Sequence, residues 1–214
     1  MVDSNNSVFI IFDECVECGN CLRSANCPTN AIYQQKLDYP RSIRKILSDP
    51  LVPDPITGVY GRGTEEIKTN DIRNNIKEGW IGMAVELGRP ITGTRFRDAE
   101  KVTKAIAKHS VKYEEANPVT PMIMDKKTGE FKKEIINEKV ISAILEFLIE
   151  PSKLIPVLES LEEVSKKVDC VFCIDIASRC DTDSISLHEK LLKDTKYENY
   201  IFPNGKYNLG LGKI

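Results

Sequence analysis

Four cysteines within thirteen residues near the amino terminus constrain this chain more than any other feature. Two-residue spacers separate Cys15, Cys18 and Cys21, and Cys27 follows with Pro28 directly after it. Such short spacers wrap the backbone tightly, so successive thiolates can each bind a different iron of one cubane. Gly19 allows the turn and a close approach of backbone N–H groups to cluster sulfides. The spacing therefore predicts an iron–sulfur cluster, most simply [4Fe–4S].

The motif also carries a resemblance. Residues 12–21, FDECVECGNC, and residues 27–32, CPTNAI, resemble the bacterial-type [4Fe–4S] ferredoxin family, and the similarity covers residues 8–33. The family has three residues between the third cysteine and Cys-Pro, whereas this chain has five, residues 22–26. In two-cluster ferredoxins the fourth cysteine binds the other cluster, and only one motif is present here. The fourth ligand is therefore either Cys27, folding back onto the same cubane, or a remote residue such as Cys180.

A zinc site is the alternative interpretation of these cysteines. Zinc ribbons need two Cys-x2-Cys pairs far apart, so three cysteines within seven residues favour iron–sulfur ligation. The total of seven cysteines is odd, which suits metal ligation in a reducing compartment better than a disulfide framework. Cys170, Cys173 and Cys180 overlap a predicted strand, where residues three apart point to opposite faces. They are either small core side chains or, for one of them, a ligand or a second metal site.

Composition excludes several classes of protein. Hydrophobic residues make up 41% of the 214 and the net charge is −2, so a buried core is expected. The near-neutral charge gives no reason to expect binding to nucleic acid or to an anionic membrane. No secretory signal and no apolar stretch long enough to span a bilayer is recognisable. We therefore expect a soluble, cytoplasmic protein.

The order of predicted elements indicates an α+β fold. Residues 7–12 and 30–33 read as short strands flanking the cysteines, and residues 41–47 allow two helical turns. A strand at 80–87, a helix at 97–108 and strands within 112–124 follow, with a turn at 125–129. A second unit repeats the pattern with a strand at 140–149, a helix at 154–164 and a strand at 171–176. Two such units predict a ferredoxin-like βαββαβ sandwich, with a four-stranded antiparallel sheet and both helices on one face.

This order divides the chain into four parts. Residues 1–36 form the cluster-binding module and residues 37–78 a Pro/Gly-rich connecting region. Residues 79–180 form the ferredoxin-like α+β domain. Residues 181–214 are a carboxyl-terminal tail with a short helix predicted at 187–193.

Two further segments are candidate anion-binding or ligand-binding sites. The loop around Arg62 and Gly63 is rich in glycine and charge, and it could cradle an anion or be a flexible surface connection. Arg89 and Arg95 flank a loop that leads into a predicted helix, where a phosphate or carboxylate could bind or the loop could simply connect. His109 and His188 have no partner in the sequence and are expected to be ordinary residues. No catalytic residue is identified.

Three other segments resemble part of a larger class of redox proteins. Residues 61–71, GRGTEEIKTND, residues 88–90, GRP, and residues 208–212, NLGLG, are similar to the ferredoxin-containing amino-terminal part of 6-hydroxynicotinate reductase-type iron–sulfur flavoproteins of anaerobes. The resemblance implies a stand-alone electron-handling subunit, with any flavin on a separate polypeptide.

The expected function is electron transfer. The chain would be an iron–sulfur protein or oxidoreductase subunit that passes single electrons to a redox partner such as a flavoprotein. The alternatives are an enzyme in its own right, with an open cluster iron or an anion-binding substrate site, and an iron–sulfur regulatory or assembly module. Self-association into a homo-oligomer stays open.

Overall fold

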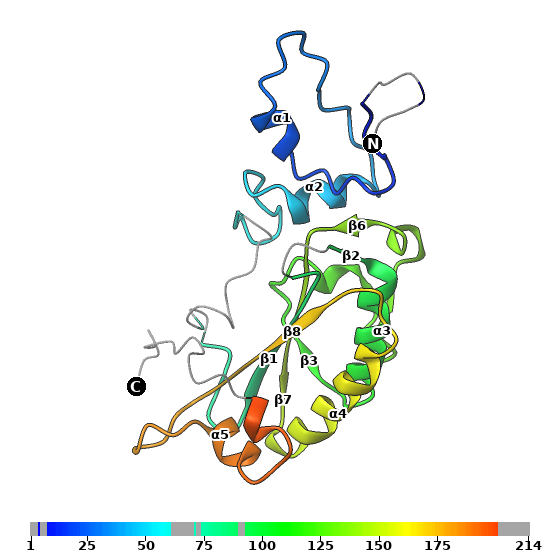
Figure 1. Cartoon of the computed structure of the whole chain (residues 1–214). Helices are drawn as coiled ribbons and strands as arrows, with labels where there is room; N and C mark the ends of the chain where they lie inside the picture. Colours follow the sequence, from blue (N-terminus) through cyan, green and yellow to red (C-terminus); the bar gives the residue numbers. More distant parts are fainter. Residues whose placement is uncertain (1–3, 5–7, 61–70, 72–73, 90–92, 201–214) are drawn as a thin grey trace.

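The computed structural model describes residues 4, 8–60, 71, 74–89 and 93–200 of the chain (Figure 1). Arg62, Gly63, Pro90 and most of the segments that carry the second resemblance lie outside the described residues. None of the described helices is long and apolar enough to cross a membrane.

A four-stranded antiparallel sheet forms the centre of the molecule. Its strands run in the spatial order β3-β7-β1-β8. Their bounds are Ile81–Leu87 for β1, Lys112–Tyr113 for β3, Ala143–Ile149 for β7 and Phe172–Ser178 for β8. Along the chain β1 is followed by a helix, β3 and β7, and then by a second helix and β8. The predicted α+β class is confirmed.

Helices α3 (Phe96–Ala107) and α4 (Leu154–Ser165) cover one face of the sheet (Figure 1). The strands turn alternate apolar residues toward them, including the fully buried Met83, Val85 and Phe147. Pro156 is the third residue of α4, where no backbone N–H donor is needed. The apolar periods of the sequence therefore predicted both helices to within one residue at each end.

The segment between β3 and β7 holds two small ribbons. Strands β4 (Ile123–Asp125) and β5 (Glu130–Phe131) form a hairpin, and β6 (Lys139–Val140) pairs with β2 (Thr94–Arg95) just before α3. Short 3-10 helices lie at Thr120–Met122 and Lys133–Ile135. Gly129, at φ 79°, ends the predicted turn at 125–129. The β2–β6 ribbon was not predicted.

The amino-terminal region contains two short helices, α1 (Asn20–Ser24) and α2 (Ser42–Ser48). Helix α2 lies in the predicted connecting region, yet its Ile43 and Leu47 are part of the main core. The strand predicted at 7–12 is wrong for residues 9–12, which form no strand in the described structure and leave Phe9, Ile10 and Phe12 exposed. Residues 30–33 have no regular structure either. An apolar segment becomes a strand only when a neighbouring strand satisfies its backbone.

The described part of the tail folds back onto the domain. Helix α5 (Leu187–Leu192) matches the helix predicted at 187–193, and the 3-10 helix Glu198–Tyr200 follows it. Ser186 and Glu189 form a reciprocal capping box at the start of α5. Leu192 reaches the core, so this part of the tail is integral to the fold.

Candidate functional site

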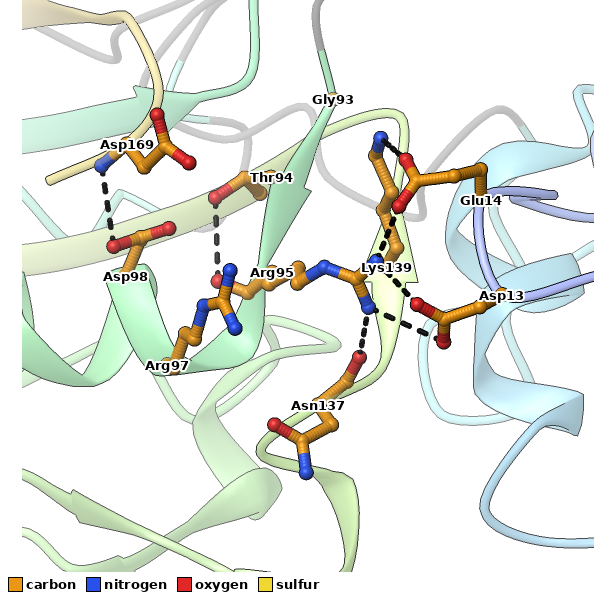
Figure 2. Close-up of a pocket in the computed structure, with 10 residues that line it drawn as sticks. All are labelled: Asp13, Glu14, Gly93, Thr94, Arg95, Arg97, Asp98, Asn137, Lys139 and Asp169. Carbon is orange, nitrogen blue, oxygen red and sulfur yellow. Dashed lines mark hydrogen bonds and ion pairs between the residues drawn. The ribbon is translucent and has the colours of Figure 1, made fainter. Parts of the chain in front are cut away.

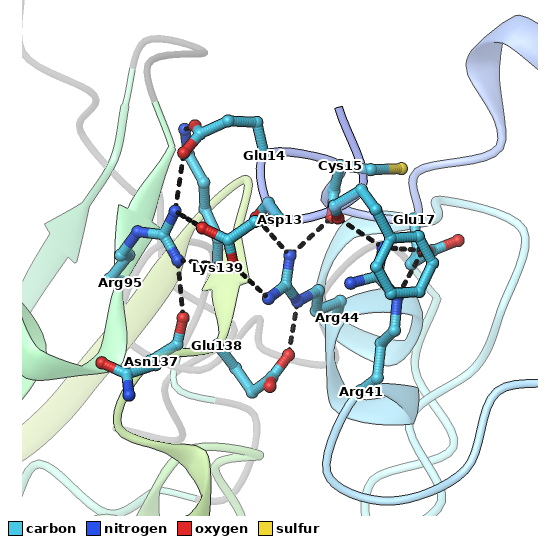
Figure 3. Close-up of polar contacts among 11 residues, drawn as sticks. Asp13, Glu14, Cys15, Glu17, Arg41, Arg44, Arg95, Asn137, Glu138 and Lys139 are labelled. Carbon is cyan, nitrogen blue, oxygen red and sulfur yellow. Dashed lines mark hydrogen bonds and ion pairs between the residues drawn. The ribbon is translucent and has the colours of Figure 1, made fainter. Parts of the chain in front are cut away.

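The cysteine loop rests on helix α2 through Arg44 (Figure 3). Nη1 of Arg44 donates hydrogen bonds to the carbonyl oxygens of Asp13 at 2.7 Å and Cys15 at 2.8 Å. Nε of the same side chain bonds to Glu138, just before β6. The Arg44 side chain is only 3% exposed. One buried guanidinium therefore joins the cysteine loop, α2 and the α+β domain.

Arg41 holds the next part of the loop through Glu17 (Figure 3). Nε of Arg41 donates to Oε1 of Glu17 at 2.8 Å, and Gln34 donates to Oε2 at 3.0 Å. Burial tends to raise the pKa of Glu17, but the bonds from Gln34 and Arg41 outweigh it and lower the pKa. Arg41 also stacks over the Phe12 ring at 3.4 Å. Glu17 therefore remains ionised between two cysteines.

Gly19 has two structural reasons to be glycine. Its φ of 68° is left-handed, which a side chain disfavours. A Cβ there would also lie 2.5 Å from Nη1 of Arg23 and 2.9 Å from Oδ2 of Asp49, which form an ion pair. Nη2 of Arg23 donates to the carbonyl oxygen of Cys18 at 2.6 Å. The space beside Gly19 therefore holds the pair that fixes Cys18, which the sequence did not predict.

The thiols differ in their surroundings. None of the cysteines forms a disulfide. Burial raises the pKa of Cys15, although the backbone N–H of Glu17 opposes this. Cys27 lies 3.4 Å from the Thr29 hydroxyl and accepts a bond from the Ala31 N–H at 3.3 Å, and these contacts lower its pKa to about 7. The lowered pKa means that Cys27 forms a thiolate, the form that binds metal, more readily than an ordinary cysteine.

The thiols of the loop are a donor set of the kind that iron–sulfur clusters use. Four free thiols, with backbone N–H groups directed at Cys15 and Cys27, are the ligands and outer contacts that iron–sulfur clusters use. A tetrahedral zinc ion holds its sulfur ligands roughly 4 Å apart. Within the described part of the chain no three of these cysteine sulfurs lie within 4.8 Å of one another.

A polar pocket of about 620 Å³ adjoins the loop (Figure 2). Nη2 of Arg95 bonds to Asp13 and Glu14, each at 2.7 Å, and Lys139 also bonds to Glu14. The hydrogen bond and charge of Arg95 hold the pKa of Asp13 below its usual value, and Lys139 with Arg95 does the same for Glu14. Arg95, predicted as an anion ligand, is thus occupied by two carboxylates of the chain. The exposed Arg97 lines the same pocket.

The other predicted residues are spread over the domain. Arg89 donates to Oε2 of Glu86 at 3.0 Å, so its charge is also compensated within the chain. Cys170 packs beside the core and lies 3.4 Å from the Thr94 hydroxyl, whereas Cys173 lies on the opposite face beside Glu86. The imidazole rings of His109 and His188 contact only serine hydroxyls among the hydrogen bonds of the described residues.

Strand β8 ends on the side of the sheet away from helices α1 and α2 (Figure 1), and Cys180 follows two residues later. It follows Ser178, which pairs with Ile81 at the start of β1, whereas Arg95 follows the other end of β1. Seven strand residues span about 20 Å. The arrangement disfavours Cys180 as the fourth ligand and favours Cys27.

Comparisons with protein families, with curated proteins and with solved structures found no match to the chain. The site therefore has to be interpreted from its own geometry. Sequence reasoning found the thiols but missed Arg41 and Arg44, the residues that position them. The available signal was two arginines three residues apart, one at the N-cap of a short helix and one in its first turn, where they lie on one side.

Proposed function

We propose that this chain is an electron-transfer protein in which Cys15, Cys18, Cys21 and Cys27 bind one [4Fe–4S] cluster. The observation that carries the proposal is the cysteine motif in a loop whose carbonyl groups are held by Arg23, Arg41 and Arg44 while its thiols form no disulfide. When bound, such a cluster accepts and releases single electrons.

Backbone N–H groups around the loop support this assignment. Backbone N–H groups that donate to ligand sulfurs tune reduction potentials in iron–sulfur proteins. The N–H groups of Glu17 and Ala31 are directed at Cys15 and Cys27.

The α+β domain supports a carrier role as well. Its sheet order and its two helices on one face suit the ferredoxin-like sandwich expected from the sequence. We assign the domain the task of holding the module and presenting it to a redox partner, such as a flavoprotein.

Reductive titration of anaerobically purified protein tests this function. We expect one reversible one-electron step, followed by EPR and visible absorption, and Cys180→Ser should leave it unchanged. A cluster that never reduces reversibly would contradict the carrier role.

Iron and sulfide counts on Cys27→Ser test the ligand set. Cys27 is the fourth ligand if the variant loses the cluster or falls from four irons to three. A full complement of iron and sulfide in that variant would remove Cys27 from the proposal.

The pocket beside the loop favours one second candidate, an enzyme in its own right. The pocket begins at Asp13, two residues before Cys15, and Arg97 and Lys139 give it cationic groups. A small carboxylate or phosphate compound bound there should alter the EPR signal of the reduced cluster in the wild type and not in Arg97→Ala. An unchanged signal in both proteins would contradict the enzyme.

A further inference from the structure

Helices α3 and α4 cover one face of the sheet, and the opposite face contains buried acidic residues. Buried positions of a strand are normally apolar. Glu86 of β1 is 3% exposed and Glu146 of β7 is 1% exposed. Asp175 of β8 is half-buried, and its neighbour Cys173 is exposed. Burying carboxylates is costly unless cations or hydrogen-bond donors accompany them, and Arg89 and Asn117 donate to Glu86 and Glu146 on this face.

The strand register brings three metal-binding groups of this face together. Glu86 pairs directly with Cys173 across β1 and β8, and Asp175 follows two residues later on the same face. The Cys173 thiol lies 3.7 Å from Oε2 of Glu86. One ligand atom from each of Glu86, Cys173 and Asp175 lies within 4.8 Å of the others. Among the described residues this is the one group of at least three acidic, cysteine or histidine side chains that is so close.

Glu146 provides a second and independent observation. Ala84 pairs with Glu146 on one side and with Asp175 on the other, so the two carboxylates flank a small side chain. Glu146 is also a diagonal neighbour of Glu86, which pairs with Ile144. Oε2 of Glu146 accepts a bond from Asn117 at 2.6 Å, whereas Oε1 accepts none within the described structure. A buried carboxylate oxygen without a donor beside such a cluster points to a cation.

We propose that Glu86, Cys173 and Asp175 bind one divalent transition-metal ion, with zinc as the best match. One thiolate with two carboxylates suits borderline-soft Zn²⁺, whereas Mg²⁺ and Ca²⁺ prefer oxygen alone. Three protein ligands leave a fourth position of the tetrahedron for water or for a further group. Arg89, 3.0 Å from Oε2 of Glu86, orients that carboxylate as outer hydrogen bonds do in metal sites. This site lies on the sheet and is separate from the cysteine loop, so it goes beyond the proposed electron transfer.

Metal binding to the full, cluster-loaded chain tests the site. Zinc bound after equilibrium dialysis would be counted by mass spectrometry, and cobalt would serve as a spectroscopic probe of thiolate ligation. We expect one zinc per chain in addition to the cluster iron, and a cobalt spectrum with a thiolate-to-metal charge-transfer band. Cys173→Ser should abolish that band and weaken zinc binding by at least about tenfold, as expected for loss of a direct ligand.

A matched control separates this site from the other thiols. Cys180 is also exposed and lies just beyond the end of β8, so Cys180→Ser should leave zinc affinity and the cobalt band unchanged. Asp175→Asn keeps the thiol and the side-chain shape. If Cys173→Ser fails to fold, the zinc affinity of Asp175→Asn tests the site instead, and we expect it to be weaker than that of the wild type. A wild-type chain with full cluster iron and no additional zinc would overturn the proposal, as would equal zinc affinity in wild type and Asp175→Asn.

Discussion

Arg44 lies on α2 with its side chain buried, where it bonds to Glu138 of the α+β domain and to two carbonyl groups of the cysteine loop. Arg44→Met would keep much of the apolar stem but leave Glu138 and both carbonyls without their donor. We expect the free energy of unfolding to fall by about 2–4 kcal/mol, because breaking a buried ion pair strands the remaining charge. Chemical denaturation would measure this change.

Arg97→Met is the matched control for that experiment. Arg97 is exposed, and no hydrogen bond or ion pair of its side chain is present in the described structure. The control should therefore change the unfolding free energy by less than about 0.5 kcal/mol. Equal losses in the two variants would show that Arg44 has no special anchoring role.

Cys27 allows a prediction about pH. Contacts with Thr29 and Ala31 lower its pKa to about 7, below the model-compound value of 9.0. A lowered thiol pKa means that the thiolate is present at lower pH. Alkylation of Cys27 in cluster-free protein should therefore rise with a midpoint near pH 7, and peptide mass spectrometry would follow it. Thr29→Val removes the hydroxyl and should move the midpoint upward, whereas identical midpoints in both proteins would contradict this explanation.

At the scale of elements, the turn that starts α1 depends on Gly19. Gly19→Ala should destabilise the fold and lower the yield of cluster-loaded protein, since a Cβ would strain the left-handed backbone and displace the Arg23–Asp49 pair. The left-handed backbone alone costs about 1–2 kcal/mol.

Gly58→Ala separates the strain of the left-handed backbone from the clash with the Arg23–Asp49 pair. Gly58 has a similar φ of 71°, and a Cβ there would meet nothing within 4 Å. The unfolding free energy of Gly19→Ala should therefore fall further than that of Gly58→Ala, and the difference measures the clash alone. If the two glycine variants lose equal stability, the clash has no effect.

Local sequence patterns predicted the elements whose apolar pattern extends over many consecutive residues. Strand β1 and helix α4 follow from continuous apolar stretches of the sequence, and both were predicted to within one residue. The two-residue strands β2 and β6 could not be predicted, because they depend on pairing between segments about 45 residues apart. Residues 9–12 have the composition of a strand, but the described structure contains no strand there.

In the candidate site, too, the local features could be predicted from the sequence and the long-range contacts could not. The cysteine spacing is local, so the sequence alone gives the candidate ligands, and their role stays a prediction. The contact between Arg44 and Glu138 joins residues 94 positions apart, and no local pattern signals it. The cluster of Glu86, Cys173 and Asp175 depends likewise on the register of β1 and β8.

At the scale of the whole molecule, ion pairs hold the cysteine loop against the β2–β6 ribbon. Arg95 and Lys139 bond to Asp13 and Glu14, whose side chains are 70% and 49% exposed. Exposed ion pairs add little to global stability, typically about 0–1 kcal/mol. Their effect should instead be local, on the mobility of the loop.

The double variant Asp13→Asn, Glu14→Gln tests this local effect. We expect faster hydrogen exchange at residues 11–18, measured by mass spectrometry, with an almost unchanged global unfolding free energy. Glu115→Gln, which removes an exposed ion pair with Lys126 elsewhere on the domain, should leave exchange at residues 11–18 unchanged. Unaltered exchange in the double variant would mean that Arg23, Arg41 and Arg44 hold the loop without Arg95 and Lys139.

The central claim is that the amino-terminal cysteines bind a [4Fe–4S] cluster. The most direct measurement is the iron and acid-labile sulfide content of the full chain, purified without oxygen, compared with Cys18→Ser. We expect about four iron and four sulfide per wild-type chain, and a loss of most of both in the variant. A wild-type chain that contains zinc without sulfide, or a Cys18→Ser protein with an unchanged iron and sulfide content, would contradict this claim.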